Sequence, residues 1–269
     1  PVGGCRSTSS ISFEYTAGPA QPPLRFARGR ALPERPELVK IVDMSATNRE
    51  FQQEQYEDPA AVNGAVEEIF SSLTHAMGVG LSVAGLVVLL ILTGRDPSPW
   101  KYVSFTIYGA SQILLFSSSA LVHSFAAMPR VRYYLRIVDQ AFVYLLIAGT
   151  YTPITLISMR GPWGWGIFIT VWVLALAGIL LKTLVFKKKH IVTDLLYLPM
   201  GWIIIFTFRP LLRLAPQGFV LWLLIGGACY TVGVLFYLWK RLPGSHVIWH
   251  LFVLGGNVSF YLGYALHVA

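Results

Sequence analysis

The chain divides at about residue 66 into a polar segment and a region of long apolar runs. In residues 1–65, proline, glycine, serine, arginine and glutamate dominate, and neither a helical nor a strand period persists. Such a composition is typical of a disordered tail. The first methionine is Met44, which suggests that residues 1–43 are not part of the natural product. We therefore expect the folded domain to span residues 66–269.

Beyond the tail, uncharged runs alternate with short charged stretches. The runs cover residues 69–93, 102–128, 137–159, 161–181, 195–208, 214–239 and 242–269. Six of them contain the roughly 20 residues that cross a hydrocarbon core of about 30 Å. The fifth run is shorter and contains Pro199, so a kinked or re-entrant element is the alternative to a full span there. The pattern predicts an all-α integral membrane protein built as a bundle of seven transmembrane helices.

The composition supports the membrane class. The chain is 55% hydrophobic and only 13% charged, with a mean hydropathy of +0.58, outside the usual balance of a soluble globular domain. Its net charge of +8 lies largely between the apolar runs, where basic residues meet anionic headgroups rather than nucleic acid. Cys5 and Cys229 lie in the tail and in an apolar run, which excludes a disulfide framework and a C-x-x-C metal site.

Basic residues between the runs predict how the bundle is oriented. More of them follow the second, fourth and sixth runs than the first, third and fifth runs. The first group is Arg130, Arg132, Arg136, Lys182, Lys187, Lys188, Lys189, Lys240 and Arg241, and the second is Arg95, Lys101, Arg160, Arg209 and Arg213. Because lysine and arginine concentrate on the cytoplasmic side, we expect a cytoplasmic N-terminus, an outside C-terminus and a place in the plasma (inner) membrane.

An acidic residue in the third run needs a partner. Asp139 and Asp194 are the only acidic residues between positions 97 and 269. A carboxylate at the depth of Asp139 costs roughly 2.5–3.5 kcal/mol on insertion scales unless it is paired or hydrated. A salt bridge to Arg136 or Arg132 is the purely structural explanation, and a functional site is the other.

Three histidines are predicted to approach the membrane depth of Asp139. His246 and His250 lie one helical turn apart, where side chains share a face about 5–6 Å apart at Cβ and can reach one ion. His123, at the end of the second run, would complete the three-ligand set that leaves zinc's fourth position open. The H-x-x-x-H spacing alone is weak, because polar residues in such helices often only find hydrogen-bond partners. Trp249 between the pair is typical of an interface anchor.

Ser119 precedes His123 by one helical turn and shares its face. In that position a hydroxyl can orient a metal ligand or hold a water or substrate oxygen. The alternative is a serine that donates back to its own helix, as serines in helices commonly do.

Six motifs, in chain order, carry a resemblance to a known family. They are EEIFSSLTHAMG, SSSALVH, RIVDQAFVYLLIAGTYTP, GPWGWG, LLYLPMGW and SHVIWHLFVLGG. Over about residues 67–269 the sequence resembles the hemolysin III proteins, which belong with the progestin and adiponectin receptors and, more distantly, the alkaline ceramidases. The resemblance implies a seven-helix bundle with a cytoplasmic N-terminus and a zinc ion near the cytoplasmic face.

The same resemblance implies roles for particular residues. It gives His123, His246 and His250 as zinc ligands, and Asp139 as a residue that approaches the zinc through water. The family's first motif, E-x-x-N-x-x-[ST]-H, begins at Glu68 and ends at His75, which are therefore expected in a supporting network rather than as ligands.

The chain departs from the family pattern at three positions. Ser71 replaces the asparagine of the first motif, and Gln140 and Phe260 stand where relatives commonly have histidine. None of these is an expected ligand. Zinc binding is therefore expected to survive, whereas any contribution of those histidines to activity is absent.

These features lead to one main hypothesis and two alternatives. The main hypothesis is a zinc-dependent hydrolase of a lipid amide or ester, in which Asp139 accepts a proton from water, Ser119 donates to the developing oxyanion and a cavity between helices admits the acyl chain. The first alternative, a membrane-permeabilising cytolysin, lacks a soluble form that could hide seven apolar spans. The second is a receptor or membrane-homeostasis protein with a structural zinc. Membrane lipids are the expected partners, and nucleic acid is not.

Overall fold

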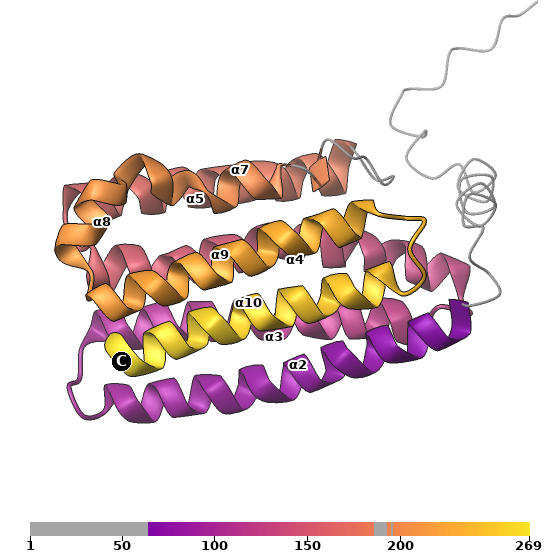
Figure 1. Cartoon of the computed structure of the whole chain (residues 1–269), viewed down its shortest axis with the longest axis horizontal. Helices are drawn as coiled ribbons and strands as arrows, with labels where there is room; N and C mark the ends of the chain where they lie inside the picture. The colour runs from indigo at the N-terminus through magenta and orange to yellow at the C-terminus, as the bar shows by residue number, and fades with distance from the viewer. Residues whose placement is uncertain (1–63, 186–192, 195) are drawn as a thin grey trace, which may run out of the picture. The chain divides into compact units, whose positions relative to one another are not determined.

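The computed structural model describes residues 64–185, 193, 194 and 196–269 (Figure 1). Six of its helices are long and apolar enough to cross a membrane. They are α2 (Gly64–Thr93), α3 (Pro99–Ser124), α4 (Pro129–Pro153) with its extension η2 (Ile154–Ser158), α5 (Pro162–Leu180) with its extension η3 (Leu181–Val185), α9 (Gln217–Leu238) and α10 (Ser245–His267). No strand occurs in these described residues, as the apolar pattern predicted. The expected disordered tail lies outside them, except that residues 64 and 65 are already helical.

Apolar side chains cover the outer surface of these helices. Ile91, Leu176 and Leu184 are 65%, 54% and 69% exposed, although each lies in a helix of membrane-spanning length. A contiguous apolar surface of this kind is not maintained by a soluble monomer. The protein is therefore a multi-pass integral membrane protein.

Proline marks the start of three of the long helices. Pro99, Pro129 and Pro162 are the first residues of α3, α4 and α5. Their missing N–H groups cost nothing there, because the first turn of a helix has no intrahelical acceptor for them. The second helix consequently begins at Pro99, three residues before the apolar run that predicted it.

Neighbouring helices pack closely where glycine allows it. α9 lies against α10, and α10 also contacts α2 (Figure 1). A Cβ atom at Gly256 would lie 2.5 Å from the Tyr230 ring, and one at Gly226 would lie 2.7 Å from the Phe260 ring. Small residues at such crossings bring membrane helices close together. α10, which carries two of the predicted ligands, is thereby held firmly against α9.

The fifth apolar region forms three short helical pieces. These are α7 (Tyr197–Gly201), the 3-10 turn η4 (Ile203–Thr207) and α8 (Phe208–Leu214). Pro199 and Pro210 each fall in the first turn of a piece, where proline is tolerated, but each prevents the preceding helix from continuing through it. The fifth region is therefore a broken helix, as in the kinked alternative to a continuous span, and its first break falls at Trp202 rather than at Pro199.

Hydrogen bonds give the direction of this broken segment. Tyr197 Oη donates to the main-chain oxygen of Gln140 at 2.9 Å, and Tyr151 Oη donates to that of Gly201 at 2.7 Å. Gln140 and Tyr151 are eleven residues apart on α4, or about 16 Å along the helix axis. The segment therefore advances in the same direction as α4.

Contacts between the ends of neighbouring helices define the two ends of the bundle. At the end where α2, α4 and α10 begin, Glu68 contacts His123 and Arg132; we call this the histidine end. At the far end, the Arg160 guanidinium lies 4.3 Å from the centre of the Trp100 ring. α10 begins at the histidine end and finishes at the far end, away from the start of α2 (Figure 1).

Candidate metal centre

Three histidines from two helices converge at the histidine end. His123 is the penultimate residue of α3, and His246 and His250 lie in the first two turns of α10. One ring nitrogen from each lies within 4.8 Å of those of the other two. The ring centroids are separated by 5.2 Å for His123 and His246, by 4.9 Å for His123 and His250, and by 4.4 Å for His246 and His250. The structure thus brings together the three side chains that the sequence singled out as ligands.

This donor set fits a divalent metal ion. Imidazole nitrogens bind zinc at about 2.0–2.1 Å, and donors of a tetrahedral site therefore lie about 3.4 Å apart. Small side-chain rotations bring the three nitrogens from their present spacing to that distance. His123 and His250 are 7% and 2% exposed and His246 is half-buried, so the site is partly shielded from bulk water. Three ligands leave one position open.

Glu68 supports His123 from the first turns of α2. Its Oε2 atom lies 2.6 Å from His123 Nδ1, and its other oxygen accepts a hydrogen bond from the Arg132 guanidinium. A carboxylate on one ring nitrogen fixes the orientation of a histidine and leaves the other nitrogen for the metal. Glu68 therefore lies where the family motif placed a supporting residue. Arg132, one of the two arginines considered as a partner for Asp139, binds Glu68 instead.

Asp139 faces α3 beside the histidines. Its Oδ1 atom lies 3.1 Å from Ser118 Oγ, and Ser119 and His123 are also close enough to interact with the carboxyl group. Ser118 was missed in the sequence, where three consecutive serines look equivalent. Only the packing of α3 against α4 shows that Ser118 as well as Ser119 reaches the carboxylate.

His75 touches the centre without belonging to the three-nitrogen group. Its ring centroid lies 3.9 Å from that of His250 and 6.4 Å from that of His123. The side chain is 4% exposed, and neither ring nitrogen has a hydrogen-bond partner among the described residues. His75 therefore contacts a ligand, as a supporting residue would.

Glu67 fixes the start of α10 and was not singled out in the sequence. Its carboxylate accepts a hydrogen bond from the main-chain N–H of Gly244. Gly244, the residue before α10, has a φ of 74°, which favours glycine because a Cβ atom is strained there. His246 follows two residues later, so Glu67 helps to place a ligand. A glutamate beside the motif residue Glu68 was the only signal available.

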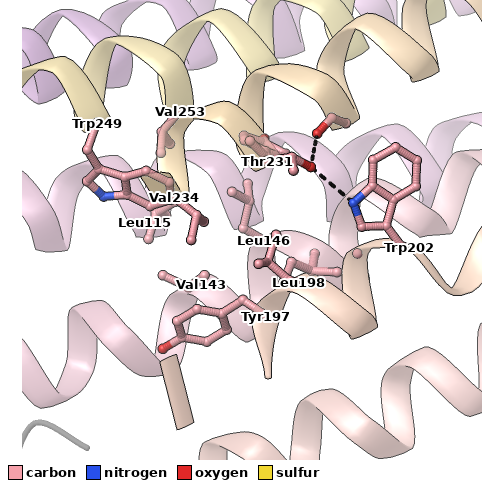
Figure 2. A pocket seen from close by; sticks show the side chains of 14 residues that line it. Leu115, Val143, Leu146, Tyr197, Leu198, Trp202, Thr231, Val234, Trp249 and Val253 are labelled. Atoms are coloured by element: carbon pink, nitrogen blue, oxygen red, sulfur yellow. Dashed lines mark hydrogen bonds between the residues drawn. The ribbon is translucent and has the colours of Figure 1, made fainter. Parts of the chain in front are cut away.

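An apolar cavity of about 90 Å³ lies among α3, α4, α7, α9 and α10 (Figure 2). Its lining includes Val143, Val253 and Trp249. Val143 follows Asp139 by one helical turn and Val253 follows His250 by three residues, so one side of the cavity adjoins the histidines. Trp249, which the sequence pattern suggested as an interface anchor, lines this cavity. At the other side Trp202 Nε1 donates to Thr231 Oγ1 at 3.0 Å.

A second group of buried charges lies outside the histidine cluster. Lys182 Nζ is 3.8 Å from Asp194 Oδ1, and Tyr237 Oη donates to Asp194 Oδ2 at 2.6 Å. The sequence placed Lys182 in a loop, which is wrong: it lies in η3, the extension of α5, and its side chain is fully buried. The two acidic residues retained after position 97 thus have different hydrogen-bond partners.

Membrane-length helices and a cluster of three histidines, two of them buried, define a multi-pass membrane protein with a candidate metal centre near one end. Residues 63–261 match the model of the haemolysin-III related family. The sequence is 43% identical over 196 residues both to hemolysin-3 of Bacillus cereus (72% of this chain, 89% of the relative) and to the hemolysin-3 homolog of Bacillus subtilis strain 168 (72% and 91%). It is 27% identical over 195 residues to the monocyte to macrophage differentiation factor of Homo sapiens (70% and 78%). The chain therefore belongs to the hemolysin III family, within the progestin and adiponectin receptor superfamily.

Proposed function

We propose that this protein is a membrane-embedded, zinc-dependent hydrolase of a lipid amide or ester. The observation that carries the proposal is the convergence of His123, His246 and His250 beside an apolar cavity. These three imidazoles hold the ion through neutral nitrogens and leave a position open. Zinc bound there supplies Lewis acidity, which acidifies water and polarises a carbonyl group.

The remaining side chains have distinct roles in this proposal. The Asp139 carboxylate accepts a proton from the attacking water, and Ser118 Oγ, 3.1 Å away, holds that carboxylate in place. Ser119 donates a hydrogen bond to the oxyanion that develops on the substrate. Glu68 orients the ring of His123 from the other side. Catalysis is thus divided between α3, α4 and α10, with support from α2.

The cavity fits the apolar part of a lipid. Leu115, Val143 and Val253 contribute an apolar surface, so an acyl chain is favoured over a polar substrate. An acyl chain in this cavity would bring its carbonyl group toward the histidine end.

The broken segment serves as a seventh crossing in this proposal. α2 begins at the histidine end and α10 finishes at the far end, which requires an odd number of crossings between them. The six long helices supply an even number. The segment formed by α7, η4 and α8 runs in the direction of α4, which supports its assignment as the additional crossing.

The histidine end faces the cytoplasm in our proposal. The connections beside this end carry several basic residues, namely Arg130, Arg132, Lys240 and Arg241. The loops at the far end carry fewer. This asymmetry favours a cytoplasmic N-terminus and an outside C-terminus. Membrane lipids are then the natural partners, and the plasma membrane is the proposed location.

Metal analysis of purified full-length protein tests the proposal. About one zinc per chain is expected for a site with three protein ligands, and the double variant His246→Ala, His250→Ala should lose it. His267→Ala is the matched control, because His267 is an exposed histidine at the other end of α10. Undiminished zinc in the double variant would refute the assignment of the ligands.

Turnover is tested separately from metal binding. Asp139→Asn should retain zinc, because Asp139 is not a ligand, yet should lose release of fatty acid from a labelled lipid amide or ester. Zinc without turnover of any such lipid in the unchanged protein would favour a structural metal in a receptor or membrane-homeostasis protein.

The names of the relatives favour one other function. The two Bacillus relatives are called hemolysin-3 and hemolysin-3 homolog, which supports a membrane-permeabilising activity as the second candidate. Release of a trapped dye from liposomes distinguishes the two functions. Leakage that persists in the His246→Ala, His250→Ala variant would support the cytolysin and contradict the hydrolase.

A further inference from the structure

Beside the three histidines, several buried polar atoms lack protein partners. Ser71 Oγ, both ring nitrogens of His75 and Nδ1 of His250 make no hydrogen bond to the described part of the chain. The three residues are 1%, 4% and 2% exposed. Buried polar groups almost always have a partner once ordered water is included. These atoms therefore require one that the protein does not supply.

The atoms belong to residues that lie together between α2 and α10. Ser71 and His75 are four residues apart and share one face of α2. The rings of His75 and His250 are 3.9 Å apart at their centroids, with an interplanar angle of 43°. Phe116 packs against another side of the His75 ring in an edge-to-face arrangement, with 5.3 Å between the ring centroids. His250 also approaches the main chain of Ser71.

We propose that a water molecule binds between Ser71, His75 and Nδ1 of His250, and that His75 positions His250 for metal binding. The inference rests on the proposed function, because it takes His250 as a ligand. A metal-bound histidine usually donates its second N–H to a carboxylate, a carbonyl or a water. Glu68 has this role for His123, and the water has it for His250.

The contact geometry makes His75 a positioning residue rather than a fourth ligand. The His75 ring, tilted by 43° and 3.9 Å away at its centroid, packs against His250, whereas the nitrogens of the other three histidines converge on one another. Packing against His75 limits rotation of the His250 ring. The shared water fixes which nitrogen of that ring remains available to the metal.

Zinc affinity, measured by competition with a chelator, tests the inference. His75→Phe keeps a ring in place but removes both nitrogens, and should weaken zinc binding about 10–100-fold, the usual effect of losing a residue that supports a ligand. Ser71→Ala should weaken it less, because the water keeps its other partners. The matched controls are His267→Phe and Ser82→Ala, which should change it less than about twofold. Ser82 is a buried serine of α2 whose hydroxyl donates to its own helix.

X-ray absorption of the cobalt-substituted protein gives an independent readout. We expect three imidazoles bound to the metal both in the unchanged protein and in His75→Phe. If the unchanged protein has four and His75→Phe has three, His75 is a ligand and the inference is overturned. Unchanged zinc affinity in both His75→Phe and Ser71→Ala would also overturn it, while leaving the proposed function intact. An unchanged protein that binds no zinc would refute both. The unfolding midpoint in chelator separates loss of affinity from loss of folding.

Discussion

Replacing Lys182 by methionine removes a buried positive charge while keeping the length of the side chain. In the folded protein Lys182 Nζ lies 3.8 Å from Asp194 Oδ1, and the two side chains are 0% and 5% exposed. At an effective dielectric constant of 20, charges at this distance attract by about 4 kcal/mol. Because Asp194 would stay buried without its counter-charge, Lys182→Met is expected to lower the free energy of unfolding by about 3–5 kcal/mol.

A surface pair in the same protein is the control. Lys101 and Asp96 are closer, at 2.8 Å, but the Asp96 side chain is 85% exposed. Exposed pairs contribute about 0–1 kcal/mol, so Asp96→Asn should have a small effect. The comparison distinguishes the effect of burial from the effect of distance, because the pair with the shorter distance is predicted to contribute less to the free energy of unfolding.

Reversible unfolding in mixed detergent micelles measures these differences. The double variant Lys182→Met, Asp194→Asn should be destabilised by less than the sum of the two single changes, because replacing both members of a buried pair is far less costly than removing one. Additive effects would refute the reasoning. A Lys182→Met effect no larger than that of Asp96→Asn would do so as well.

Three further predictions concern the metal centre, the packing and the cavity. Glu68→Gln should weaken zinc binding about 10-fold or more, since the carboxylate on His123 is lost; chelator competition measures this, and an unchanged affinity would contradict the role of Glu68. Gly256→Ala should destabilise the bundle by about 1–3 kcal/mol, because its Cβ would lie 2.5 Å from the Tyr230 ring, whereas Gly80→Ala, with no atom within 4 Å, should not. Val143→Phe narrows the cavity and should reduce lipid turnover with zinc content unchanged; equal turnover would exclude this cavity as the acyl site.

Local chemistry explains why much of the architecture was predictable. The six long helices follow from apolar runs of membrane-spanning length, since lipid forces every main-chain polar group to be satisfied within a helix. The break in the fifth region agrees with the kinked alternative that this short run with Pro199 allowed. The pairing of His246 with His250 on one face is equally local, because it depends only on helical spacing.

Contacts between helices were harder to predict. Arg132 was considered as a partner for Asp139 but binds Glu68, and Ser118 reaches Asp139 from a run of three serines. Lys182 was assigned to a loop but is buried. Each of these outcomes depends on how far one helix is rotated about its axis relative to another, which no single run encodes.

The sequence by itself determined an all-helical membrane protein, a short fifth run in which a broken helix was one alternative, and the set of histidines that can meet at one membrane depth. These properties are local, since about 20 consecutive residues decide whether a helix enters lipid. Only the tertiary structure decided that Glu67 and Glu68 tie α2 to the elements carrying the histidines, and that His75 lies against His250. The physical reason is that lipid does not favour one apolar helix face over another. Close packing at small residues such as Gly226 and Gly256 selects which faces meet.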